Sequence, residues 1–232
     1  MPEGNFFHYD QAAVDHLARK DKKLAAAMQA IGPVRREVMP DLFQALMHAI
    51  TGQQISMAVQ RTVWRRLCGL LGEVTPQALL AQPQTALQAL GLSARKVDYM
   101  RGIARQVVDG ELDLPGMAAL EDAEVCRRLA ALRGIGVWTA EMLLLFSLQR
   151  PDILSYDDLA IRRGLRMLYR HKEMPRERFE RYRRRFSPYG SLASLYLWAI
   201  AGGALPELDD PAERKKGRSR PAASLKSTVT KD

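Results

Sequence analysis

The stretch LRGIGVWTA, residues 132–140, decides the fold because it joins two segments of helical periodicity through two closely spaced glycines. Gly134 and Gly136 allow a very tight turn between a helix expected over 121–132 and another over 137–148. The turn leaves the first N–H groups of the second helix open, and such a helix end attracts phosphate. Backbone contacts of this kind carry no sequence information, which suits a protein that binds any DNA. The alternative is a plain helix corner with glycine as the C-cap.

Helical spacing of apolar residues continues on both sides of this turn. Leu42, Leu46 and Ile50 recur at intervals of four, and no stretch alternates apolar and polar residues in the manner of a strand. The sequence therefore predicts an all-α protein of about ten to twelve short helices. The segment 187–206 has no charged residue, but it contains Pro188, and its apolar part of about ten residues predicts a buried helix rather than a membrane span.

Composition narrows the class of protein. The chain has 232 residues, 47% of them hydrophobic, and its two cysteines exclude a disulfide framework and a site of four thiolates. The net charge of +9 makes nucleic acid the first candidate partner, with a solvated basic surface as the alternative. Residues 209–232 hold seven Lys or Arg against four acids, which predicts a disordered basic tail after a folded part over 1–208. No basic region followed by an apolar run opens the chain, so we expect a soluble, cytoplasmic protein.

The hairpin stretch resembles the helix–hairpin–helix signature of the DNA glycosylase superfamily, L-P-G-[IV]-G, with Arg133 at the proline position. In that superfamily an Asp follows about twenty residues later at the start of a helix, and Asp158 lies twenty-two residues after Gly136, with Ile161 completing the D-x-x-[IM] spacing. The resemblance implies that the carboxylate of Asp158 stabilises an oxocarbenium-like transition state and orients or deprotonates the attacking water. The alternative is that Asp158 only caps a helix; Asp157 is the weaker candidate, as a cap or as support.

Further motifs narrow the resemblance to the alkylbase branch, the bacterial 3-methyladenine-DNA glycosylase II type. They are ITGQQIS at 50–56, GLSARKVDY at 91–99 and PYGSLASLYLW at 188–198, where Gly190 replaces the usual arginine. Bifunctional members carry a lysine nucleophile where this chain has Trp138, and the four cysteines of the iron–sulfur members are missing. Both absences imply a monofunctional glycosylase that forms no Schiff base and has no AP lyase activity.

The resemblance also assigns residues that would handle a base flipped out of the duplex. Gln54 is the expected wedge that fills the gap in the stack, although polarity at the end of a helix is an alternative for Gln53 and Gln54. Trp138 and Trp198 would stack on a cationic alkylated base, with ordinary core packing as the alternative. The remaining base-pocket residues implied are Met57, Met142, Leu159, Ala160 and Gln53. The DNA-binding residues implied beside Gln54 are Arg133, Gly134, Gly136 and Thr139.

Two of these positions bear on the substrate. Met142 replaces a family aromatic and Ala160 a larger apolar residue, so we expect a roomier pocket that admits 1-methyladenine or 3-methylcytosine beside 3-methyladenine and 7-methylguanine. No organic cofactor is implied. The resemblance allows a monovalent cation at the hairpin, held by the backbone carbonyls of Leu132 and Ile135.

The expected architecture has two helical lobes with the DNA cleft between them. One lobe would hold about 1–55 and 149–208, and the other about 56–148. The expected partner is double-stranded DNA containing alkylated bases, bound by a monomer without a membrane. Two other functions stay open: a non-catalytic helix–hairpin–helix DNA-binding protein, and a glycosylase for other damaged bases.

Overall fold

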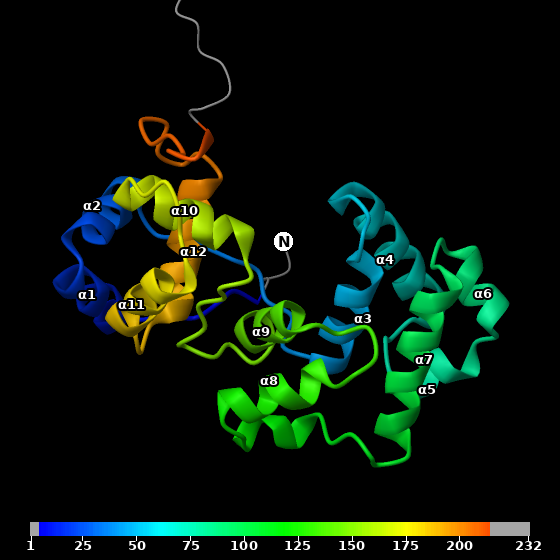
Figure 1. Cartoon of the computed structure of the whole chain (residues 1–232). Coiled ribbons are helices and arrows are strands. Elements are labelled where there is room, and N and C mark those ends of the chain that lie inside the picture. The colour runs from blue at the N-terminus through cyan, green and yellow to red at the C-terminus, as the bar shows by residue number, and fades with distance from the viewer. Residues whose placement is uncertain (1–4, 214–232) are drawn as a thin grey trace, which may run out of the picture.

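The computed structural model describes residues 5–213, and these residues form an all-α fold, as predicted (Figure 1). The only extended pairing among the described residues is an isolated bridge between Phe6 and Glu37. The helices are α1 (Gln11–Lys20), α2 (Lys22–Ile31), α3 (Leu42–Gly52), α4 (Met57–Leu71), α5 (Pro76–Ala81), α6 (Gln84–Ala89), α7 (Ala94–Val108), the short 3-10 helix η1 (Pro115–Ala119), α8 (Asp122–Ala130), α9 (Val137–Phe146), α10 (Leu159–Tyr169), α11 (Arg176–Phe186) and α12 (Gly190–Ala201).

Two hydrophobic cores divide these helices into two lobes. The terminal lobe contains α1, α2 and α10–α12, and its core includes the fully buried Leu17, Leu24 and Phe179. The hairpin lobe contains α3–α9, and its core includes Leu46, Ile50 and Leu67. Figure 1 shows the two groups of helices side by side, with α9 between them. The terminal lobe therefore combines helices from the beginning and the end of the described chain.

The boundary between the lobes lies earlier in the chain than predicted. We expected residues up to 55 in the terminal lobe, but α3 packs against α4, α7 and α9 and belongs to the core of the hairpin lobe. The reason is the breadth of its apolar surface. Phe43, Leu46, Met47 and Ile50 are all buried, and the short α1 and α2 are already packed against α10–α12. Periodicity indicates which face of a helix is buried but not which neighbour covers it.

A glycine brings α10 and α12 together. A Cβ atom at Gly164 would lie 2.3 Å from the carbonyl oxygen of Leu197, so only glycine fits at this crossing. The contact sets the distance between the start of α10, which carries Asp158, and the stretch of α12 that carries Trp198. As predicted from its composition, the segment around Leu197 is a buried helix. No helix within residues 5–213 combines the length and apolarity needed to cross a bilayer.

The ordered chain extends past the predicted end of the folded part. Residues 209–213 were expected to belong to a disordered tail, but Asp210 is buried and accepts hydrogen bonds from Arg166 of α10. This carboxylate anchors the chain after α12 because it neutralises an arginine that is largely covered. The remainder of the predicted tail, 214–232, lies outside the described residues.

Candidate active site

Asp158 accepts three hydrogen bonds from neutral donors and is buried at the start of α10. Its Oδ1 accepts from the backbone N–H of Ile161 at 2.8 Å, so it is the N-cap of α10. Oδ1 also accepts from the indole Nε1 of Trp198 at 3.1 Å, and Oδ2 from that of Trp138 at 2.9 Å. The carboxylate is thus held from both lobes at once. None of these donors carries a charge, so the negative charge is left to act on a cation beside it.

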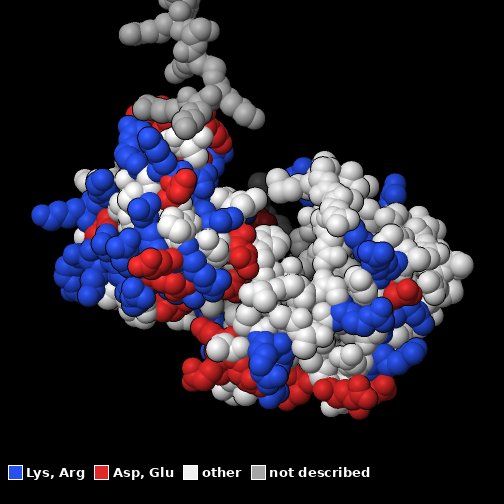
Figure 2. Space-filling model, in the orientation of Figure 1, with Lys and Arg blue, Asp and Glu red and all other residues white. Residues whose placement is uncertain are grey.

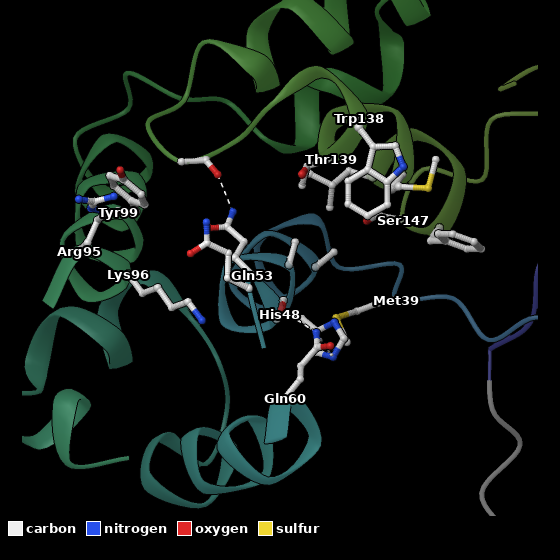
Figure 3. Close-up of a pocket in the computed structure, with 18 of the residues that line it drawn as sticks. Met39, His48, Gln53, Gln60, Arg95, Lys96, Tyr99, Trp138, Thr139 and Ser147 are labelled. Carbon is white, nitrogen blue, oxygen red and sulfur yellow. Dashed lines mark hydrogen bonds between the residues drawn. The ribbon is translucent and has the colours of Figure 1, made fainter. Parts of the chain in front are cut away.

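A cavity of about 1130 Å³ lies next to this cluster, in the hairpin lobe (Figure 3). Trp138, half-exposed at 47%, lines the cavity and also donates to Asp158, so its indole connects the cavity to the carboxylate. Phe146 lines the cavity next to it and stacks on Trp198 with ring centroids 5.4 Å apart. Two aromatic rings, those of Trp138 and Phe146, therefore lie in the cavity wall next to the two indoles that donate to Asp158.

The hairpin predicted from the glycine pair is formed by α8 and α9. Gly134 has φ +90°, and a Cβ atom there would lie 2.3 Å from the ring of Tyr99, so this glycine is required by the fold. Gly136 is the N-cap of α9 and has φ −93°, and a Cβ atom there would meet nothing within 4 Å. No side chain caps this end of α9. The N–H groups of its first turn therefore face open space, where a phosphate can approach.

The loop between α3 and α4 holds the two predicted glutamines in different roles. Gln53 lines the cavity, and its Nε2 donates to the carbonyl oxygen of Gly134 at 2.6 Å, which ties this loop to the hairpin. Gln54 is exposed and has φ +56°, a left-handed conformation that a residue with a side chain adopts only at a cost. That backbone presents the side chain of Gln54 at the cavity.

The structure brings most, but not all, of the predicted pocket residues together. Met142 and Thr139 line the cavity beside Trp138, and Trp198 lies behind Phe146. Met57 and Leu159, also predicted as pocket walls, do not line this cavity, and their role stays a prediction. Each is the first residue of its helix, and their side chains are 76% and 73% exposed, outside the cavity. Ala160 is half-buried and does not line the cavity either, so only Met142 carries the argument for a roomier pocket.

Exposed apolar side chains mark the surface around this site. They come from the three segments that the motifs identified: Ile55 and Met57 after α3, Val137 and Trp138 in the hairpin, and Leu159 at the start of α10. Exposed apolar residues gathered in this way indicate a binding surface. Asp157 is exposed beside them and does not cap α10, which Asp158 does.

The other hairpin residues are placed as follows. Arg133 is exposed, with its guanidinium carbon 5.7 Å from the centre of the Tyr99 ring. The carbonyl oxygen of Leu132 accepts a turn hydrogen bond from the N–H of Ile135 at 3.0 Å. A carbonyl oxygen has a second lone pair, so this bond leaves Leu132 able to bind a cation together with Ile135. The cation site stays a prediction.

Sequence reasoning missed a polar pair in the cavity wall. The amide Nε2 of Gln60 donates to the backbone carbonyl of His48 at 3.1 Å and lies 3.3 Å from the ring Nε2 of His48. Burial lowers the pKa of His48, because it disfavours the charged form of the ring. Gly52 makes room for the Gln60 side chain, which a Cβ atom would overlap at 2.4 Å. His48 lies in a largely apolar helix, and its sequence context does not indicate a pocket.

Comparison with known proteins gives a consistent result. Residues 47–188 match the model of the HhH-GPD superfamily base excision DNA repair proteins. The chain is 33% identical to a DNA-3-methyladenine glycosidase of Bacillus halodurans, with a TM-score of 0.78 over 88% of this chain and 95% of that one. It is 29% identical over 209 residues to DNA-3-methyladenine glycosylase 1 of Schizosaccharomyces pombe, covering 87% of this chain and 91% of that protein.

A structure of the 3-methyladenine DNA glycosylase Mag1 of Schizosaccharomyces pombe in complex with abasic DNA is also similar. Its identity is 29% and its TM-score 0.71, over 81% of this chain and 95% of that one. The family match covers more than half of the chain, including α8, α9 and Asp158. The fold, the hairpin and the motifs agree with it. This chain belongs to the HhH-GPD superfamily of base excision DNA repair proteins.

Proposed function

We propose that this protein is a monofunctional DNA glycosylase that hydrolyses the N-glycosidic bond of alkylated bases in double-stranded DNA. The observation that carries the proposal is the carboxylate of Asp158, held between the indoles of Trp138 and Trp198 beside a cavity that admits a flat ring. The names of the similar proteins, which act on 3-methyladenine, support the same substrate class.

The proposed reaction begins when the damaged nucleotide leaves the stack and its base enters the cavity. Gln54, exposed on its left-handed backbone, fills the gap in the duplex. Phosphates of the same strand are held by the open first turn of α9. These contacts read no sequence, so damage is recognised by how readily the base leaves the duplex and fits the cavity.

The chemistry follows from the charges. Alkylation at N3 or N7 makes a purine cationic, and a cation stacked on the indole of Trp138 gains on the order of 1–2 kcal/mol when desolvated. The cationic base is already a good leaving group and needs no strong general acid. As the C1′–N bond breaks, positive charge moves to the sugar, where the carboxylate of Asp158 stabilises it and orients the water that attacks C1′. The neutral base and an abasic site are the products.

Two features favour hydrolysis without strand cleavage and a broad substrate range. Trp138 has no amine to form a Schiff base with C1′, so we expect no AP lyase step. Met142 is flexible and lines a large cavity, which supports acceptance of 7-methylguanine, 1-methyladenine and 3-methylcytosine beside 3-methyladenine.

The test is release of free methylated bases from a methylated duplex by the wild-type protein and by Asp158→Asn. Asn keeps the oxygen that caps α10, but its amide group faces an indole N–H, so we expect a small fall in Tm and loss of base release. Binding of an abasic duplex checks that the variant is intact. Binding by both proteins without release by either would instead favour a non-catalytic DNA-binding protein.

A further inference from the structure

Positive charge is concentrated on the terminal lobe, away from the cavity. In the view of Figure 2, Lys and Arg cover much of the lobe that contains α1, α2, α10 and α11, whereas the hairpin lobe is largely uncharged. Most of the segment 162–185, with eleven Lys or Arg against three acids, lies on this lobe in α10 and α11. The reaction proposed above uses none of these cations.

An aromatic stack organises four of them at the C-terminal end of α10. The rings of Tyr169 and Tyr182 lie 4.3 Å apart, and the Nε2 of His171 shares a hydrogen bond of 2.8 Å with the hydroxyl of Tyr182. The ammonium of Lys23 lies 5.9 Å from the Tyr169 ring, and the guanidinium of Arg185 lies 5.3 Å from the Tyr182 ring.

The other two cations of the cluster lie on α11, with Arg178 one helical turn before Tyr182 and Arg181 one turn before Arg185. The pKa of His171 is lowered first by burial and then by three nearby cations, Arg178, Lys23 and Arg181. We call Lys23, Arg178, Arg181 and Arg185, with the stack that they surround, the basic patch. α11 supplies Arg178, Arg181 and Arg185, and the fold adds Lys23 from α2.

The patch has little neutralising charge of its own. The carboxylate that acts on the same tyrosines is Asp21, which is buried, caps α2 and lies 2.7 Å from Arg185. Glu173, Glu177 and Glu180 lie in the same segment, but the eleven Lys or Arg of 162–185 outnumber these three acids, so the surface keeps an excess of positive charge. Like charges held together in this way repel one another, and an added polyanion relieves the repulsion.

The chemistry of the surface identifies the polyanion. A protein partner needs apolar or aromatic anchors, but the large hydrophobic side chains that are exposed within residues 5–213 lie on other helices or, as with Leu159, at the other end of α10. A surface of Lys and Arg side chains without exposed large hydrophobic residues suits the phosphate backbone of DNA. His171 immediately follows the helix that Asp158 begins, and eleven residues of helix put them about 16 Å apart. The patch is therefore separate from the site of base excision.

We propose that the basic patch binds the phosphate backbone of duplex DNA outside the base-excision cleft. This inference rests on the proposed function only in taking DNA as the polyanion. The bound backbone would belong either to the flank of the duplex in the cleft or to a second duplex. In both cases it would hold the protein on undamaged DNA while the cleft samples bases.

The test compares Lys23→Gln/Arg178→Gln/Arg181→Gln with a control of equal charge, Arg65→Gln/Arg105→Gln/Arg127→Gln, on the hairpin lobe. Arg185 is kept because it pairs with Asp21. Binding of an undamaged duplex of about 40 base pairs is measured against NaCl concentration. Each lost phosphate contact lowers the slope of log K against log[salt] by about 0.9, so the patch variant should lose up to about 3 in slope and at least about tenfold in affinity. The control should keep a steeper slope than the patch variant.

Two further measurements make the result specific. On adding the duplex, the pKa of His171, followed by NMR, should rise because phosphates offset the nearby cations. A complex formed on a short abasic duplex is then offered a second, labelled duplex. Capture by the wild type and not by the patch variant assigns the patch to a second duplex, whereas a defect seen only with long duplexes assigns it to the flank. An unchanged slope together with an unmoved His171 would overturn the proposal.

Measuring base excision by the same variants separates a failure of this proposal from a failure of the proposed function. On a short lesion duplex the patch variant should release base at the wild-type rate if the glycosylase assignment is right. Failure of excision by every protein, with the slope change intact, would refute the glycosylase and leave the patch in place.

Discussion

At the scale of single residues, Asp158 receives more hydrogen bonds than helix capping requires. The cap needs only the bond from Ile161, yet two indoles from α9 and α12 also donate to the carboxylate. Two tryptophans aimed at one buried carboxylate fix its position relative to both lobes. A cap that served only the stability of α10 would need neither of them.

We therefore predict that Trp138→Phe and Trp198→Phe slow base release while keeping an aromatic ring. Each variant removes one donor to a charged acceptor, a bond that contributes about 1.5–3 kcal/mol, so the rate should fall about 10- to 100-fold if the bond acts in the transition state. Single-turnover release of 7-methylguanine measures the effect. A rate unchanged in both variants would show that the indole N–H groups have no part in the reaction.

Motifs predicted the residues that meet at Asp158 but not all of the pocket. Trp138 and Trp198 are identified by their place in short segments, and the fold brings both to the carboxylate. Met57 and Leu159 are exposed and do not line the cavity, because each is the first residue of its helix and lies beyond the faces that pack. His48 could not have been predicted as a wall residue, since its exposure to a cavity depends on how α3 meets α4 and α9.

At the scale of elements, the two hairpin glycines serve different ends. Gly134 is required by its positive φ and by the ring of Tyr99, whereas Gly136 has an ordinary φ and open space around it. Since the fold does not require glycine at position 136, we infer that the space around Gly136 serves a ligand such as a DNA phosphate. Gly134 is thus needed for folding, and Gly136, two residues later, for binding.

We predict that Gly134→Ala and Gly136→Ala separate these ends experimentally. Gly134→Ala should lower the free energy of unfolding by about 2 kcal/mol or more, because the new methyl group overlaps the Tyr99 ring. Gly136→Ala should cost less than about 1 kcal/mol but weaken binding of an abasic duplex, because its methyl stands where phosphate approaches. Urea unfolding and a binding titration measure the two quantities. Equal loss of stability in both variants would contradict this division.

The motif segments also contain residues with structural roles. Ser56 and Ser93 cap α4 and α7. The ammonium group of Lys96 donates to the carbonyl oxygen of Thr51 near the end of α3, at 2.8 Å. Gln53 joins two loops that are 81 residues apart. Local caps can be predicted from sequence because both partners are neighbours, and such distant bonds cannot.

At the scale of the whole molecule, the stability of the terminal lobe depends on the ion pair between Arg166 and Asp210, which holds the chain after α12 against α10. Burial alone would raise the pKa of Asp210. The hydrogen bonds from Arg166 and from the backbone N–H of Ala212, together with the charges of Arg166 and Arg163, more than offset burial and lower the pKa below its ordinary value of 3.8. A carboxyl whose pKa is lower in the folded state stabilises the fold above its unfolded pKa. This contribution is lost as the pH falls through the folded value.

We predict that Asp210→Asn lowers the free energy of unfolding at pH 7 by about 1–3 kcal/mol, because it leaves a largely covered arginine without its charge partner. The difference between variant and wild type should shrink as the pH falls below about 4, where the wild-type carboxyl becomes protonated. Thermal unfolding from pH 7 to pH 2.5 measures it. A difference that stays constant over this range would exclude the ion pair as its cause.

The division of the lobes along the chain has a consequence for protein synthesis. The hairpin lobe is continuous in sequence, from α3 to α9, and contains the glycine turn and the cavity. The terminal lobe needs both ends of the chain, and Trp198 lies on its last helix. During synthesis on the ribosome, all residues of the hairpin lobe have been made before α10–α12, against which α1 and α2 pack, are available. The lobe that contains the hairpin and the cavity is thus completed first, and the carboxylate gains both of its indole partners only when translation has nearly finished.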